Sequence, residues 1–91
     1  MATNAVLFKI DGERVAHTLE EARGSLEGAE GEVVLDFSSV HRVDPSALRA
    51  MEGLANMMNG NASSVALRGV NIDVYRVLKL TRLASRFSFL S

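Results

Sequence analysis

The chain has 91 residues, 47% of them hydrophobic and 23% charged, so it is expected to form one globular domain. It contains no cysteine, which excludes a disulfide framework, a thiolate metal site and a cysteine nucleophile. Its 10 basic and 11 acidic side chains give a net charge of −1, which provides no overall attraction to nucleic acid.

No apolar run in the sequence approaches the roughly 20 residues that a membrane-spanning helix needs. Residues 1–5 lack the charged segment and apolar core of a signal peptide. We therefore expect a cytoplasmic protein that does not insert into a membrane.

The first predicted strand covers residues 6–10, a β-branched and aromatic run bounded by the turn-forming pair Asp11-Gly12. Thr18 and Glu21 have the spacing of a capping box, in which each side chain bonds the backbone N–H of the other residue. Apolar residues at helical spacing then predict a helix over about residues 19–27.

A glycine-containing loop is predicted at residues 28–31. Residues 33–37 are nearly all apolar, which predicts a strand covered on both faces. The next helix is predicted over residues 45–58 and is expected to end at Asn59-Gly60. Four apolar residues form its predicted inner face: Ala47, Met51, Leu54 and Met58.

A third strand is predicted within residues 63–68, followed by a helix that Asn71 caps, with Asp73 favourably placed in its first turn. Residues 87–90 are predicted to form a last strand or a packed tail. This alternation of strands and helices predicts an α/β domain with a largely parallel sheet. The inner face of the third helix is predicted to consist of Val74, Val77, Leu78 and Thr81.

Charge is unevenly distributed along the chain. The first third carries most of the acidic residues, and the last quarter carries five basic residues against Asp73 alone: Arg68, Arg76, Lys79, Arg82 and Arg86. We interpret this basic region as a solvated helix face, with an acidic partner or lipid headgroups as the alternatives.

The segment before residue 45 is the main candidate for a functional site. It joins the end of a strand to the start of a helix, which is where an open α/β sheet meets its partners or anionic ligands. Asp44 can cap the free N–H groups of the helix, and Pro45 fits the first helical position, where a missing N–H costs nothing. His41, Arg42 and Arg49 are polar residues expected to be exposed around this helix start.

Two chemical interpretations of this region are disfavoured. Ser46, His41 and Asp44 are the residue types of a hydrolase triad, but three side chains within six residues of one loop seldom reach that geometry, and no nucleophile-elbow glycines surround the serine. A metal site would need His17 and His41 to converge with a carboxylate from different loops. No phosphate-cradling glycine motif is present, so no cofactor is expected.

Three segments resemble the STAS domain family, typified by the bacterial anti-sigma factor antagonists. Asp11-Gly12-Glu13 and residues 18–21 resemble the family's strand–Gly–Glu turn and the opening of its first helix. Residues 33–40 with Val43-Asp44 look like the central strand and its Asp-Ser-Ser/Ala-Gly loop. Residues 69–78 are similar to the Gly-Val-Ser-Pro-x-Val-x-x-Val-Leu segment that opens the third helix.

The resemblance covers residues 6–90 and implies one STAS-like domain over residues 1–91. The implied architecture is a mixed, mostly parallel sheet of four to five strands with helices packed on it. The first strand of a typical family member is expected to be missing or reduced to the first few residues.

The sequence departs from the family at the phosphoacceptor. In the antagonists a serine directly after the Asp of the motif is phosphorylated, but this position is Pro45, which has no hydroxyl. The glycine that lets a partner approach is replaced by Ala47. Ser46 keeps a hydroxyl one place later, about 100° further round the helix, so its phosphorylation is only a secondary hypothesis.

The resemblance therefore implies a non-enzymatic regulatory module that binds a partner protein, with an anti-sigma or serine-kinase-like protein as the expected partner. The alternative is a small STAS subunit that supports the ATPase of a lipid-transport ABC system, which the missing phosphoacceptor favours. A small hydrolase or ligand-binding domain is a second alternative, and the sequence leaves homodimer formation open. The expected partner-binding residues are His41, Arg42, Asp44, Pro45, Ser46, Ala47 and Arg49.

Overall fold

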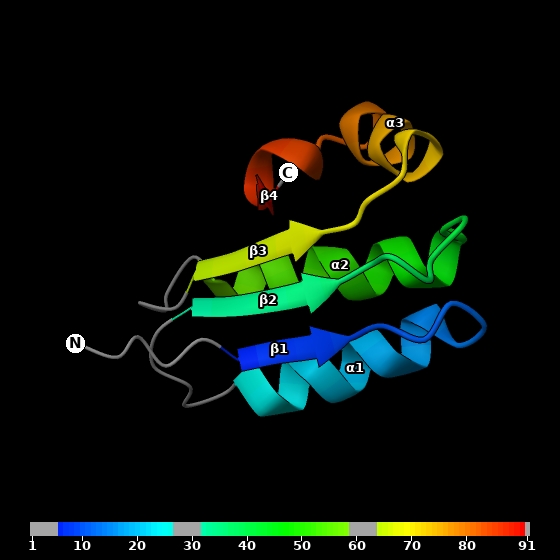
Figure 1. Ribbon diagram of the computed structural model, residues 1–91. Helices are drawn as coiled ribbons and strands as arrows, with labels where there is room; N and C mark the ends of the chain where they lie inside the picture. Colours follow the sequence, from blue (N-terminus) through cyan, green and yellow to red (C-terminus); the bar gives the residue numbers. More distant parts are fainter. Residues whose placement is uncertain (1–5, 27–31, 59–63, 91) are drawn as a thin grey trace.

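A computed structural model describes residues 6–26, 32–58 and 64–90 of the chain, which alternate between strands and helices (Figure 1). The elements in chain order are β1 (Val6–Lys9), α1 (Val15–Leu26), β2 (Glu32–Asp36), α2 (Pro45–Met58), β3 (Ser64–Arg68), α3 (Ile72–Leu80), the 3-10 helix η1 (Ala84–Arg86) and β4 (Ser88–Leu90).

The four strands form one sheet in the order β1-β2-β3-β4, and every pairing among the described strands is parallel. Leu35 of β2 lies opposite Phe8 of β1 and Leu67 of β3, and Leu67 in turn lies opposite Phe89 of β4. The expected α/β domain with a mostly parallel sheet is therefore confirmed. Residues 1–5, where the first strand of the family was expected to be reduced or missing, lie outside the described residues.

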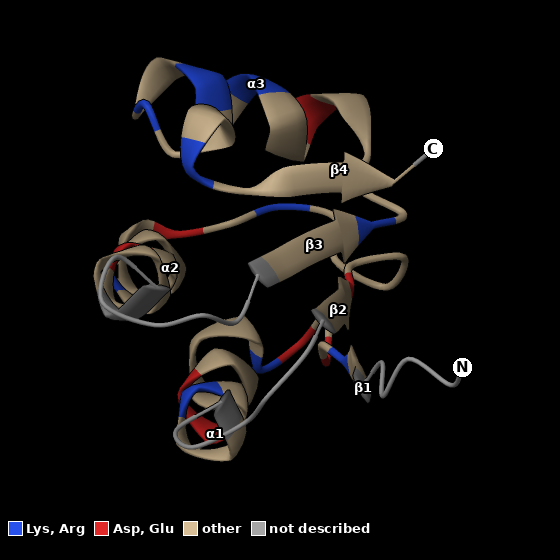
Figure 2. Cartoon of the chain, turned by 90° about the vertical axis from the view of Figure 1, so that its left-hand side faces the viewer, with Lys and Arg blue, Asp and Glu red and all other residues tan. Residues whose placement is uncertain are grey.

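Helices α1 and α2 lie side by side on one face of the sheet, and α3 lies beside the β4 edge (Figures 1 and 2). Val33 and Leu35 point toward these helices and are buried, whereas Val34 between them is only partly buried. The prediction that β2 is covered on both faces is wrong, because no helix of the described residues lies on the second face.

The start of α1 differs from the prediction. The helix begins at Val15, and Thr18 lies inside it, where its hydroxyl donates to the carbonyl of Arg14 at 2.7 Å. The predicted capping box is therefore wrong, because the Thr18 side chain bonds back to the preceding turn. The turn before the helix is formed by Asp11, whose carboxylate accepts from Glu13 N at 2.9 Å and whose carbonyl accepts from Arg14 N at 3.2 Å.

The predictions for α2 and α3 are largely confirmed. Helix α2 starts at Pro45, and three residues of its predicted stripe are fully buried: Ala47, Met51 and Leu54. Asn71 caps α3 by accepting from Val74 N at 2.8 Å. Thr81 is the exception, because it is the exposed C-cap of α3 and not part of its inner face. The side chain of Met58 and the predicted turns at residues 28–31 and 59–60 lie outside the described residues.

Candidate functional site

Residues 37–44 form the β2–α2 loop at the carboxyl edge of the sheet, between the β1–α1 turn and the β3–α3 turn (Figure 1). All three connections meet at this edge because parallel strands direct their carboxyl ends the same way. Backbone hydrogen bonds continue the sheet into the loop, from Ile10 N to Asp36 O at 3.0 Å and from Phe37 N to Arg68 O at 2.8 Å. The candidate site predicted from the sequence therefore lies where the topology of the sheet places a binding surface.

Asp44 caps helix α2 as predicted. Its Oδ1 accepts from Ala47 N at 2.8 Å, and its carbonyl oxygen accepts from Leu48 N at 3.0 Å. The cap satisfies an N–H group at the helix start and is worth about 1 kcal/mol of stability. The cap thus holds the first turn of α2 in place, and Pro45 and Ser46 are exposed on this turn.

Two glycines in the neighbouring turns press directly against the β2–α2 loop. A Cβ at Gly12 would lie 1.9 Å from the carbonyl oxygen of Ser39. Gly69 has a φ of +70°, and a Cβ there would lie 3.0 Å from the backbone N of Ser38. Since both close contacts are with the same two-residue segment, Ser38-Ser39 is held between the two turns.

Asn71 adds a third attachment. Its Nδ2 donates to the carbonyl oxygens of Val40 at 3.2 Å and of His41 at 3.3 Å, while its Oδ1 caps α3. One side chain therefore joins the start of α3 to the loop before α2. The sequence indicated the cap but not this contact, although an asparagine at a cap position has a spare amide donor that could have suggested it.

A row of charged residues crosses the sheet at the same edge. Asp36 lies opposite Lys9 in β1 and Arg68 in β3. The backbone N–H of Ser38 donates to Asp36 Oδ1 at 2.9 Å. This bond is the main cause that lowers the pKa of Asp36 below its ordinary value of 3.8, and a side-chain hydrogen bond from Ser38 is the second cause. Burial raises this pKa, but by less than either hydrogen bond lowers it. The positive charges of Arg68 and Lys9 lower it further.

Six of the seven predicted site residues present exposed side chains at or next to this loop, and we call them the β2–α2 loop surface: His41, Arg42, Asp44, Pro45, Ser46 and Arg49. Ala47 is a correction. It is fully buried, because it belongs to the apolar stripe of α2 that faces the core, and its N–H is already bonded to Asp44. It supports the surface from below and is not available to a partner.

His41, Asp44 and Ser46 are neighbours in the sequence, but the structure does not connect their side chains as a catalytic triad. No hydrogen bond joins any two of these three described side chains, and Asp44 is engaged as a cap. His17 lies on α1, where its Nε2 is 3.8 Å from a carboxylate oxygen of Glu21. Within the described residues, no group of three His, Asp or Glu side chains is arranged to hold a metal ion.

No helix among residues 6–26, 32–58 and 64–90 is long and apolar enough to cross a membrane. Shallow hollows of about 300 and 160 Å³ lie beside the loop at the β1–α1 turn. The second of them is lined by Gly12, Glu13, Val15, Arg42 and Asp44. The arrangement is a firmly held, polar surface with only small hollows, which suits contact with another protein better than enclosure of a small molecule.

Comparison with known proteins gives a family match over almost the whole sequence. The model of the STAS domain family matches residues 2–90. A comparison with curated proteins finds no match.

Solved structures with the same fold come from regulatory and transport settings. A crystal structure of a candidate anti-sigma factor antagonist from Thermotoga maritima has a TM-score of 0.73 at 19% identity, with 100% of this chain and 82% of that chain covered. A crystal structure of a sulfate transporter family protein from Wolinella succinogenes has a TM-score of 0.74 at 18% identity, with coverages of 93% and 75%. An NMR structure of the Thermotoga protein, TM1081, gives 0.79 at 19% identity, with coverages of 100% and 77%. At such low identities the likeness establishes a shared fold.

Proposed function

The chain belongs to the STAS domain family, and on this basis we propose that it is a non-enzymatic module that regulates a partner protein by binding it through the β2–α2 loop surface. The expected partner is an anti-sigma or serine-kinase-like protein, and the expected setting is the cytoplasm. The fold is shared with a candidate anti-sigma factor antagonist, which supports a regulatory role of this kind.

The observation that carries the proposal is the way the loop is held. Gly12 and Gly69 press against Ser38-Ser39, and Asn71 binds the carbonyls of Val40 and His41. A surface that is already ordered loses little conformational entropy when a partner binds, so even a modest contact area can give useful affinity. The exposed residues on it, His41, Arg42 and Arg49, are then carried by backbone that belongs to this held loop or to helix α2.

Regulation of this contact would not depend on phosphorylation at the usual family position. Pro45 occupies that position and has no hydroxyl. Ser46 is exposed beside it at the N-terminus of α2, where a phosphate would be electrostatically favourable. We keep Ser46 as a secondary candidate only, because its side chain leaves the helix in a different direction from that of residue 45.

The alternative within the same fold is a small subunit that supports the ATPase of a lipid-transport ABC system. The specific observation in its favour is again Pro45, because such a subunit does not need a phosphoacceptor. It predicts a stable complex with an ATPase, whereas the regulatory role predicts a reversible complex with a kinase-like protein.

The first prediction concerns Arg49. Arg49→Glu reverses an exposed charge on the second turn of α2 and should abolish capture of the partner from native lysate, identified by mass spectrometry. Arg23→Glu is the matched control, because Arg23 is an exposed arginine in the last turn of α1, away from the loop. The control should bind like the wild type.

The identity of the captured protein decides between the two roles. A kinase-like protein lost only with Arg49→Glu supports the regulatory role, and an ATPase accompanied by membrane subunits supports the transport role. Capture that is equal for the wild type and Arg49→Glu would mean that the loop surface is not the interface.

A further inference from the structure

A second surface lies between α3 and β4. Five large apolar side chains of the described residues are exposed, and three of them line one hollow: Ile72, Tyr75 and Leu90 are 68%, 40% and 46% exposed. The other two are Leu7 and Leu80, and Leu80 also belongs to α3. Scattered apolar residues on a surface need no explanation, but a cluster in a hollow indicates a binding site.

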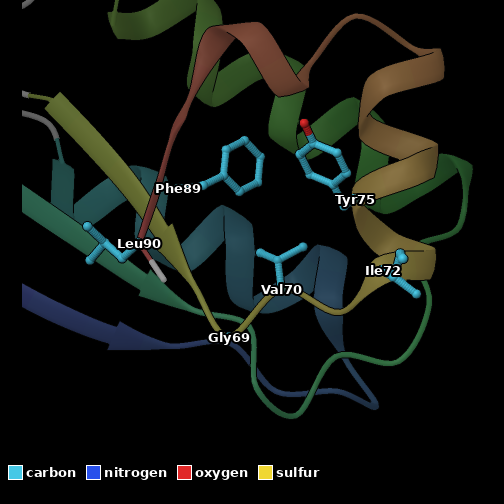
Figure 3. A pocket seen from close by; sticks show the side chains of 6 residues that line it. All are labelled: Gly69, Val70, Ile72, Tyr75, Phe89 and Leu90. Atoms are coloured by element: carbon cyan, nitrogen blue, oxygen red, sulfur yellow. The ribbon is translucent and has the colours of Figure 1, made fainter.

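The hollow has a volume of about 420 Å³ and includes Phe89 and the turn at Gly69 and Val70 (Figure 3). Figure 3 shows the rings of Tyr75 and Phe89 next to each other between α3 and β4. Their centroids are 5.2 Å apart at an interplanar angle of 78°, which is a favourable edge-to-face arrangement. This pair holds the two walls together and presents an aromatic surface to an incoming side chain.

A second hollow of about 380 Å³ continues from the first along α3 and shares Tyr75 and Phe89 with it. Its lining includes Lys79 and Arg82, so an apolar hollow and a basic hollow lie on either side of the shared Tyr75–Phe89 pair, and together they make up one binding surface. We call it the α3–β4 groove. Within residues 6–26, 32–58 and 64–90 the ion pairs are His17–Glu21 and Glu20–Arg23, both in α1, so Lys79 and Arg82 have no carboxylate partner there.

The backbone at Arg82 gives an independent reason to assign a role to its side chain. Helix α3 ends in a Schellman motif, with Leu83 N donating to Leu78 O at 2.8 Å and Arg82 N donating to Lys79 O at 3.2 Å. Arg82 occupies the left-handed position of this motif, with a φ of +65°. Glycine is preferred at such a position because a Cβ is strained there. An arginine in its place indicates that the side chain has a function that offsets the strain.

We propose that the α3–β4 groove binds an acidic segment of a partner protein. A large apolar side chain of the segment would enter the hollow lined by Ile72, Tyr75 and Phe89, and neighbouring carboxylates would pair with Lys79 and Arg82. The apolar anchor provides affinity, and the charges select the segment and its direction. This surface is distinct from the β2–α2 loop surface, so the proposal goes beyond the regulatory contact.

Two other occupants fit the groove less well. A symmetric contact with a second copy that is centred on the basic hollow would bring Lys79 and Arg82 of both copies together, and like charges in an interface are unfavourable. A lipid surface would contact the basic residues, but it offers no side chain to fill a concave aromatic hollow. A segment with both an apolar anchor and carboxylates matches both ends of the groove.

The test is selection of a random-peptide phage library on the immobilised full chain, followed by fluorescence polarisation with the best synthetic peptides. We expect selected peptides to combine carboxylates with a large apolar residue. Their affinity should fall about tenfold or more with Arg82→Gly and with Tyr75→Ser, and stay unchanged with the control Arg23→Ala. Arg82→Gly should also raise the melting temperature, so its loss of binding would not reflect misfolding.

Each contrary result overturns the proposal. Selected peptides without carboxylates, no selected peptides, or peptides that bind Arg82→Gly like the wild type would exclude an acidic segment as the occupant. The phage selection could yield no peptides while the chain co-sediments with phosphatidylserine vesicles in a way that requires Arg82. This result would assign the basic residues to lipid binding. A dimer in analytical ultracentrifugation that Tyr75→Ser dissociates would assign the groove to a second copy.

Discussion

At the scale of single residues, Asn71 connects stability to the candidate site. Its Oδ1 caps α3, and its Nδ2 bonds two carbonyls of the loop that precedes α2. An aspartate at this position would keep the acceptor for the cap but would replace the donor by a second oxygen, facing the carbonyls of Val40 and His41. The two roles of Asn71 can therefore be separated by one substitution.

We predict that Asn71→Asp lowers the free energy of unfolding by about 2 kcal/mol, because the part-buried bond to the Val40 carbonyl and the exposed bond to the His41 carbonyl lose their donor, and both carbonyls meet a negative charge. Asn71→Ser should cost less, since it removes the attachment without adding charge. Urea denaturation measures the stability, and amide hydrogen exchange at Val40 measures the order of the loop. Unchanged exchange at Val40 in Asn71→Asp would show that the loop does not depend on this side chain.

The pKa of Asp36 gives a pH dependence. Since the folded-state pKa lies below the ordinary value of 3.8, the ionised form stabilises the fold at pH values above that value. This contribution is lost as the pH falls through the lowered pKa. The stability difference between the wild type and Asp36→Asn should thus be constant near neutral pH and shrink below 3.8, as measured by denaturation at about pH 7 and about pH 3. A difference that does not change with pH would contradict the assignment.

At the scale of elements, the sequence predicted the helices whose caps are local. Asp44-Pro45 opens α2 and Asn71 opens α3, because each cap bonds an N–H only three residues later. The start of α1 was missed because a different local bond competed, that of Thr18 to the carbonyl of Arg14. The prediction for Ala47 is wrong for another reason: the residue lies both in the apolar stripe of α2 and at the family position that a partner approaches, and the stripe determines its burial.

The contacts that order the β2–α2 loop were beyond prediction from the sequence. They join Gly12 to Ser39 and Asn71 to Val40, residues that are far apart in the chain. No periodicity or cap pattern encodes such a contact; it appears only when parallel strands bring their carboxyl ends to one edge. The sequence therefore indicates a candidate site at this edge but not the contacts that hold its loop.

A pair of glycine substitutions tests this close packing. Gly12→Ala would place a Cβ 1.9 Å from the carbonyl oxygen of Ser39. It should lower the free energy of unfolding by about 3 kcal/mol, because backbone must move to make room. Gly24→Ala is the control: nothing lies within 4 Å of a Cβ there. It should stabilise α1 by about 1 kcal/mol, since alanine favours a helix. Equal stabilities of the two variants in thermal or urea denaturation would contradict the contact.

At the scale of the whole molecule, the order of the strands in space is the order of the strands in the chain. Each strand except the first is added beside its predecessor, so β4 pairs with β3 alone and through only three residues. Helix α3 buries only Val74 and Leu78. The last part of the chain is consequently held by fewer contacts than the centre of the sheet, where β2 pairs on both sides with a buried core around Leu35.

This uneven distribution has a consequence for the α3–β4 groove. Its two walls belong to a terminal part of the fold that few pairings hold, and such units open at a lower cost than the centre of a sheet. A segment that contacts both α3 and β4 would stabilise the closed state of this part of the chain. Its observed affinity would therefore be lower by the free energy needed to suppress the local opening. Occupancy would then change the dynamics of the C-terminal third of the chain without any change in the backbone of the β2–α2 loop.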